Sequence, residues 1–152
     1  MDAGELGEGI EHLNEAARLD PRDTQAHVFL GVAMLRQQQD DRASASFRQA
    51  LEIDPDCVPA LLRLASLLST SKNRGFGSRE EAVTLATKAR ELTDQQDVTA
   101  LLALASVCEA AGRTADALSA AENALRLAHD AGNQRLINAI RQRLARLTPP
   151  AP

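Results

Sequence analysis

Large aromatic side chains are nearly absent from this chain of 152 residues. It has no tryptophan, no tyrosine and only three phenylalanines, so aromatic clusters do not organise its core. Hydrophobic residues still make up 44% of the chain, and most of them are alanine and leucine. We infer a core built from small side chains and closely approaching backbones, in a chain long enough to bury it as one domain.

Cysteine, glycine and proline are also scarce, and their positions restrict the fold. Six prolines and eight glycines fall mostly between apolar stretches, which favours long helices over many short strands. Cys57 and Cys108 are far apart and form no CxxC pair or Cys/His cluster, so neither a metal site nor a disulfide framework is predicted. We therefore predict an all-α protein with no cofactor.

An excess of positive charge and long apolar runs are lacking too. The formal net charge of -4 gives no general attraction for nucleic acid or anionic membranes. No apolar run approaches the roughly 20 residues that cross a bilayer, and residues 1–5 lack the features of a signal peptide. We expect a soluble chain without a nucleic-acid partner or membrane segment. The cytoplasm is favoured, or the periplasm if the chain is part of a membrane protein.

An Asp-Pro pair recurs with a spacing of 34 residues, at positions 20–21 and 54–55. Between the pairs, small and apolar residues follow helical spacing in two blocks separated by the polar segment 37–41. This pattern is typical of a repeat built from two helices. Corresponding residues recur in three units: Leu30, Gly31, Ala43, Phe47, Ala50 and Pro55; Leu64, Ala65, Ala82, Ala86 and Ala89; and Leu104, Ala105, Ala117, Ala121 and Ala124.

These residues resemble the tetratricopeptide repeat (TPR), whose consensus of about 34 residues has Leu-Gly in the first helix, two spaced alanines in the second and then Pro. The resemblance covers nearly the whole chain and implies a right-handed superhelical solenoid of αα-hairpins with about eight helices. Two departures stand out. The usual Trp and Tyr positions of the first unit hold His27 and Met34, and about five extra residues around 72–78 lengthen the second unit.

The small residues have a geometric explanation. Where the two helices of a hairpin cross, Gly31, Ala43 and Ala50 let the backbones come close. Ser78 begins a capping box, and Asp41, Asp56, Asp97 and Thr114 are suited to N-cap positions. We predict helices at about 5–19, 23–38, 41–53, 57–71, 79–93, 97–111, 114–130 and 133–147.

One domain over residues 1–148 is expected. Its parts are a partial repeat with the second helix only (1–21), three repeats (22–55, 56–95 and 96–130) and a capping helix (132–147), followed by a disordered tail (149–152). The partial repeat leaves Leu6 and Ile10 without a partner, so we expect either a longer parent protein or self-association through this end.

The C-terminal helix has an apolar stripe of Leu136, Ile140, Leu144 and Leu147, which is typical of a cap. On its other face, Arg141, Arg143 and Arg146 are expected to be solvated. The segment 128–147 resembles the end of TPR regions in large bacterial proteins, including some membrane glycosyltransferases, and implies a natural C-terminus.

Nothing in the sequence combines a nucleophile, a base and an orienting group, so we predict that the chain is not an enzyme. His12, His27 and His129 belong to different units, with His27 in a packing position and the other two exposed. Cys108 lies in a core position and is expected to be an inert thiol.

The TPR resemblance implies that the first helix of each unit lines a concave groove. By the repeat phase, the candidate partner-binding residues are Gln25, Phe29, Val32, Arg36, Arg63, Ser66, Thr70, Leu102, Ser106 and Glu109. Phe29 is a candidate anchor for a partner side chain, although packing under the preceding helix is equally compatible with the sequence.

Three functions stay open. The favoured one is a protein–protein interaction scaffold that binds a peptide or helix of a partner in the groove. The alternative is a C-terminal oligomerising or structural module of a larger protein, such as a bacterial membrane glycosyltransferase. A helical-repeat RNA binder is disfavoured by the acidic charge.

Overall fold

The computed structural model describes residues 3–70 and 78–148, with side chains from residue 7 onward. All regular structure in this part of the chain is helical. Its helices are α1 (Ala3–Leu19), α2 (Thr24–Arg36), α3 (Asp40–Ile53), α4 (Val58–Thr70), α5 (Arg79–Leu92), α6 (Val98–Ala110), α7 (Thr114–Asp130) and α8 (Gln134–Leu147). The all-α prediction is confirmed, and the predicted helix ends lie within about two residues of those observed. The lengthened loop and the disordered tail, predicted at about 72–78 and 149–152, fall outside the described residues, apart from Ser78.

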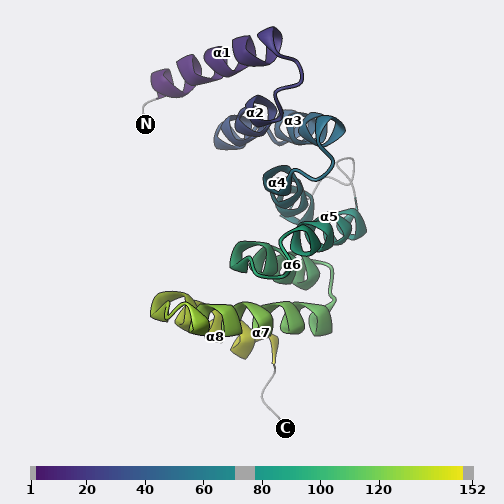
Figure 1. Ribbon diagram of the computed structural model, residues 1–152, viewed down its shortest axis with the longest axis vertical. Coiled ribbons are helices and arrows are strands. Elements are labelled where there is room, and N and C mark those ends of the chain that lie inside the picture. Colours follow the sequence, from purple (N-terminus) through teal and green to yellow (C-terminus); the bar gives the residue numbers. More distant parts are fainter. Residues whose placement is uncertain (1–2, 71–77, 149–152) are drawn as a thin grey trace.

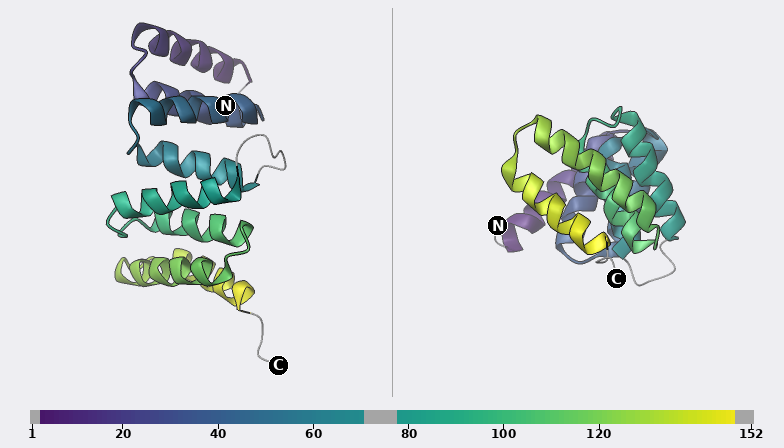
Figure 2. Two further views of the ribbon diagram at one scale, coloured as in Figure 1. Left: turned by 90° about the vertical axis from the view of Figure 1, so that its right-hand side faces the viewer. Right: turned by 90° about the horizontal axis from the view of Figure 1, so that it is seen from below.

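The helices pack as sequential hairpins that stack in one direction. α2 packs on α3, α4 on α5 and α6 on α7, while α1 and α8 pack on α2 and α7. Figure 1 shows the resulting rod with α1 at one end and α8 at the other, and Figure 2 shows it from the side and end-on. The first helices of neighbouring hairpins are also in contact, α2 with α4 and α4 with α6, so they form one continuous layer.

The repeated alanines lie where the helices cross. Ala43, Ala50, Ala82, Ala86 and Ala89 are fully buried, as are Ala117, Ala121 and Ala124 in the third hairpin. Because a methyl side chain keeps little distance between two backbones, these positions allow close contact without cavities. Leucine and isoleucine fill the space between hairpins, with Leu61, Leu64, Leu101 and Ile140 among the fully buried side chains.

Gly31 leaves no room for a side chain. A Cβ atom there would lie 2.7 Å from both Cδ1 and Cζ of Phe47, and closer still to Cε1. The Phe47 ring is itself fully buried, so it has no solvent-exposed space to move into. Glycine is therefore required at this crossing of α2 and α3 by the ring that packs against it.

Only part of the predicted helix capping is observed. Asp97 accepts hydrogen bonds from the amides of Thr99 and Ala100, and Ser78 accepts one from Glu81, as predicted. Two other caps were not predicted: Asp23 accepts from Ala26 and Asn133 from Leu136.

The N-cap predictions for Asp41, Asp56 and Thr114 are wrong. α3 and α7 start after Gln39 and Arg113, neither of which makes a side-chain capping bond. These two helices follow tight turns in which Gln38 and Gly112 have positive φ, and the turn amides bond to the last carbonyls of the preceding helix.

The recurring Asp-Pro pairs also have a structural role. Asp54 accepts a hydrogen bond of 3.0 Å from the amide of Asp56, and Asp20 accepts the equivalent bond from Arg22 at the same length. Each aspartate thus forms an Asx turn around the proline that follows it. The turn directs the chain from the second helix of one hairpin into the first helix of the next, which explains why the pair recurs.

Candidate functional site

The first helices α2, α4 and α6 present their outward side chains on a common layer. Eight of the ten predicted groove residues are exposed: Gln25, Phe29, Arg36, Arg63, Ser66, Thr70, Ser106 and Glu109. Val32 and Leu102 are half-buried. All ten are thus accessible to a partner, although partner binding through them stays a prediction.

Phe29 is the most unusual of these residues because 54% of its surface is exposed. It lies on α2 beside an open depression of about 470 Å³ that reaches across to the turn between α3 and α4. Apolar side chains line much of it: Val28 from α2, and Val58 and Pro59 from α4. The depression is large enough to take a side chain of the size of leucine, methionine or phenylalanine.

The rim of the depression is acidic. Asp54 and Asp56 line it from the α3–α4 turn, and both are exposed. Asp56 also forms an ion pair of 2.8 Å with Lys88 of α5, so its charge is partly neutralised. Arg63 lies one turn after Pro59 and is exposed on the same face of α4.

Sequence reasoning found Phe29 but not the other wall of this depression. Val58 and Pro59 follow the Asp-Pro pair, and the helical phase alone places them at the start of a helix without showing what lies opposite. The packing of α4 on α2 brings them to Phe29. The 34-residue spacing was the available signal, because it aligns each such turn with the start of a first helix.

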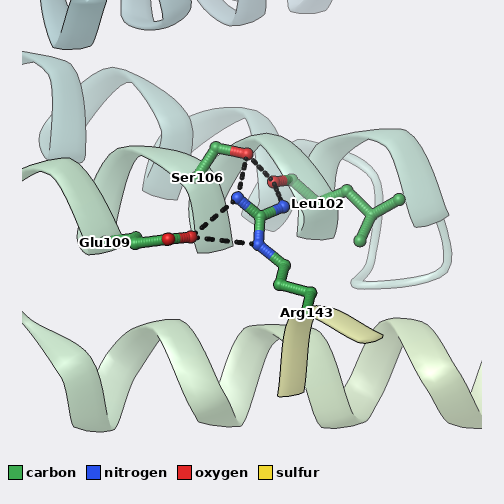
Figure 3. A network of polar contacts seen from close by, with 4 residues as sticks. All are labelled: Leu102, Ser106, Glu109 and Arg143. Carbon is green, nitrogen blue, oxygen red and sulfur yellow. Dashed lines mark hydrogen bonds and ion pairs between the residues drawn. The ribbon is translucent and has the colours of Figure 1, made fainter. Parts of the chain in front are cut away.

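At the other end of the layer, Arg143 of α8 reaches the side chains of α6, as Figure 3 shows. Its Nη2 donates to Ser106 Oγ at 2.7 Å and to Glu109 Oε2 at 3.0 Å, and its Nε donates to the same carboxylate oxygen at 3.2 Å. Nη1 lies 3.5 Å from the Leu102 carbonyl oxygen. Three of the predicted groove residues are therefore held together by one guanidinium group.

The prediction that Arg143 is solvated is wrong, since its side chain is only 20% exposed. Arg143 follows Glu109 by 34 residues, which is one repeat length. In the repeat, Arg143 on α8 therefore corresponds to Glu109 on α6. Viewed as an isolated amphipathic helix, α8 does not reveal this neighbour, whereas the repeat phase does. Arg141 and Arg146 are exposed, as predicted.

The isolated histidines and the buried cysteine match their predictions. His27 is buried, with Nε2 lying 3.3 Å from the Pro21 carbonyl oxygen, while His12 and His129 are exposed. Burial raises the pKa of the Cys108 thiol, which disfavours the reactive thiolate. Within the described part of the chain, no three His, Cys, Asp or Glu side chains gather as a possible metal-ligand group.

The comparisons with known proteins agree with this arrangement. A family model described as the middle TPR-like domain of cilia and flagella-associated protein 70 matches residues 2–128. The chain belongs to this family of TPR-like domains. Such domains are generally protein-interaction modules and are typically non-catalytic.

A curated relative is the DnaJ homolog subfamily C member 7 homolog of Schizosaccharomyces pombe, which is 30% identical over 122 residues. That match covers 74% of this chain but only 26% of the relative, so the chain spans about a quarter of that protein. The relatives thus include a yeast protein, and a bacterial source for this chain is not established.

Solved structures of MamA share the fold of this TPR-like chain. One crystal structure of MamA protein has a TM-score of 0.69 at 18% identity and covers 95% of this chain and 79% of that one. A MamA fragment from Desulfovibrio magneticus RS-1 has a TM-score of 0.68 at 15% identity, with coverage of 95% and 84%. Among the described residues, no helix is both long and apolar enough to span a membrane.

Proposed function

We propose that this TPR-like chain is a scaffold that binds a peptide or helical segment of a partner protein across α2 and α4. The supporting observation is Phe29, an aromatic side chain that is 54% exposed beside an apolar depression of about 470 Å³. An aromatic side chain left in water beside an unfilled apolar depression is typical of an interaction hot spot.

The contacts of Arg143 with α6, at the other end of the layer, also favour a binding site at Phe29. Arg143 already satisfies the Glu109 carboxylate and the Ser106 hydroxyl, so these groups offer little further binding energy to a partner. The apolar wall formed by Phe29, Val58 and Pro59 has no such internal ligand in the described part of the chain. The partner segment therefore inserts an apolar side chain next to Phe29, while the exposed Arg63 contributes mainly to orientation.

The test is an affinity capture with purified wild-type chain and a Phe29→Ala variant, followed by mass spectrometry. We expect the variant to lose specific partners by at least tenfold, because truncating an interface hot spot costs roughly 2 kcal/mol or more. Leu92→Ala is the matched control, since Leu92 is also an exposed apolar residue, at 41%, but lies at the end of α5. If Phe29→Ala captures the same partners as wild type and Leu92→Ala do, with unchanged helicity, the groove proposal is refuted.

The second candidate is a C-terminal oligomerising or structural module of a larger protein, such as a bacterial membrane glycosyltransferase. Two observations favour it: the chain covers only 26% of the yeast relative, and α1 contacts only α2 among the described helices. Ile10 and Leu13 of α1 are therefore left half-buried. Leu6, the other residue predicted to mediate self-association, has a side chain outside the described part. Sedimentation across a concentration series tests this function: a dimer that Ile10→Glu dissociates supports it, and a strict monomer counts against it.

A further inference from the structure

The α3–α4 turn, which lines the depression at Phe29, belongs to an edge of the rod that is rich in carboxylates. The turns α1–α2, α3–α4 and α5–α6 lie along this edge, as the left view of Figure 2 shows. The charged residues of the three turns are Asp20, Arg22, Asp23, Asp54, Asp56, Asp94 and Asp97. Six carboxylates and one guanidinium group give the turns a formal charge of -5. A partner that lies along this edge therefore meets a negative field.

Two of these carboxylates, Asp54 and Asp56, line the depression itself, and none of its nine lining residues is basic. The charge of Asp56 is partly compensated, because Lys88 Nζ lies 2.8 Å from its Oδ1. Lys88 also donates a hydrogen bond of 2.7 Å to the carbonyl oxygen of Pro55. The ammonium group is thus bound to the turn at two points and compensates Asp56 rather than Asp54.

Asp54 carries the charge of the depression that is left over. Its Oδ1 accepts the backbone amide of Asp56 at 3.0 Å, and the structure shows no ion pair of Asp54 within the described residues. The side chain is exposed, so a cation can reach it without losing all of its water. A carboxylate that accepts one amide retains further acceptor positions, so Asp54 can also accept from a lysine or an arginine.

The positive groups near the depression do not cancel this charge. Thr24 and Val58 are the first residues of α2 and α4, so two helix N-termini lie at the depression. Each corresponds to about half a positive charge, and Asp23 already caps α2. Arg63 lies one turn further along α4, on the side away from the α3–α4 turn. The side at Asp54 is therefore the place for a cation of the partner.

We propose that the segment bound in this depression is basic, with a lysine or arginine close to the apolar side chain that inserts beside Phe29. The cation pairs with Asp54 at the α3–α4 turn, while the apolar side chain contacts Phe29 and Val58. This inference rests on the proposed function, because it names the chemistry of the segment that the same depression binds. The carboxylates along the edge also attract such a segment from a distance and accelerate its association.

Short random peptides displayed on phage are the probe. They are selected on the full wild-type chain, and those that also bind Phe29→Ala are removed. The remaining peptides depend on the depression. Next to their apolar residues we expect enrichment of lysine and arginine and depletion of aspartate and glutamate, because like charges along the edge repel each other. Their affinity should fall as the salt concentration rises.

Asp54→Asn tests the residue that carries the inference. An asparagine oxygen can accept the same turn amide, so this variant removes the charge and retains the Asx turn. The dissociation constant of a selected peptide should rise about two- to fivefold, as expected for the loss of an exposed ion pair. Asp20→Asn is the matched control, since Asp20 forms the equivalent turn bond of 3.0 Å one repeat earlier and does not line the depression. Equal affinity of Asp54→Asn and wild type overturns the inference.

A double-mutant cycle separates direct pairing from the general field of the edge. The lysine of the selected peptide is replaced by glutamine, and this peptide is measured with wild type and with Asp54→Asn. If the two charges pair, the replacement weakens binding to wild type by about two- to fivefold and has little effect on binding to the variant. An equal loss in both backgrounds overturns the pairing with Asp54.

The same selection distinguishes this inference from the proposed function. Peptides that depend on Phe29 but carry no basic residue overturn the inference and leave the binding site at Phe29 in place. If every selected peptide binds Phe29→Ala as tightly as wild type, with unchanged helicity, both are overturned.

Discussion

Replacing Gly31 with alanine tests the central packing feature of the fold. The new Cβ atom would lie 2.7 Å from two atoms of the Phe47 ring, where ordinary contacts begin near 3.4 Å. Neither partner has room to move, since Gly31 and Phe47 are both buried at the crossing of α2 and α3. The backbones of the two helices must therefore separate by several tenths of an ångström.

Two opposing contributions determine the size of the effect. Overpacking a tight core by one methyl group typically costs about 1–3 kcal/mol. Alanine in a helix interior is favoured over glycine by about 0.8–1.0 kcal/mol. We expect Gly31→Ala to destabilise the chain by roughly 1 kcal/mol net, measured by urea unfolding followed by circular dichroism at 222 nm.

Gly9→Ala is the matched control. Gly9 also lies inside a helix, α1, but a Cβ atom there would meet nothing within 4 Å. This variant keeps the helix-propensity gain without the steric cost, so it should stabilise α1 by up to about 1 kcal/mol. The difference between the two variants isolates the overpacking.

A double-mutant cycle with Phe47→Leu identifies the ring as the cause. If the ring occupies the space that the new methyl needs, Phe47→Leu should cost less in the Gly31→Ala background than in wild type, with a coupling of roughly 1 kcal/mol. Stability equal to that of Gly9→Ala, or a coupling of zero, would refute the packing argument.

Three further predictions concern single interactions. Arg143→Gln should destabilise α8 by roughly 1 kcal/mol, a modest value because the Glu109 side chain is 41% exposed and screened by water; hydrogen exchange should increase in α8 before it increases in α2. Asp97→Ala should cost about 1 kcal/mol in urea unfolding through loss of its N-cap bonds, whereas Asp41→Ala should change little, because Asp41 does not cap α3. Because burial raises the folded-state pKa of the Cys108 thiol, folding is favoured with the thiol protonated, and this contribution is lost as the pH rises from about 8.5 through the folded pKa. The stability advantage of wild type over Cys108→Ala should therefore shrink between pH 7.5 and pH 10, and a constant difference would contradict the assignment.

Much of the architecture follows from the local pattern of residues. Alanines and leucines at helical spacing, interrupted by polar turns, predict each helix to within about two residues. The recurring Asp-Pro pairs predict the repeat length, and Gly31 together with Ala43 and Ala50 predicts a close helix crossing. These features could be read in advance because a helix and its turns depend on residues that are near one another in sequence.

The candidate sites depended on contacts between hairpins. Phe29 could be placed on the exposed layer from the repeat phase, but only the packing of α4 on α2 revealed Val58 and Pro59 beside it. The apolar stripe of α8 predicts a solvated Arg143, because the pattern of one helix contains no information about α6, where Glu109 lies 34 residues earlier. Periodicity thus determined the helices and their order, while the stacking of the hairpins decided which side chains meet, because those contacts join residues a full repeat apart.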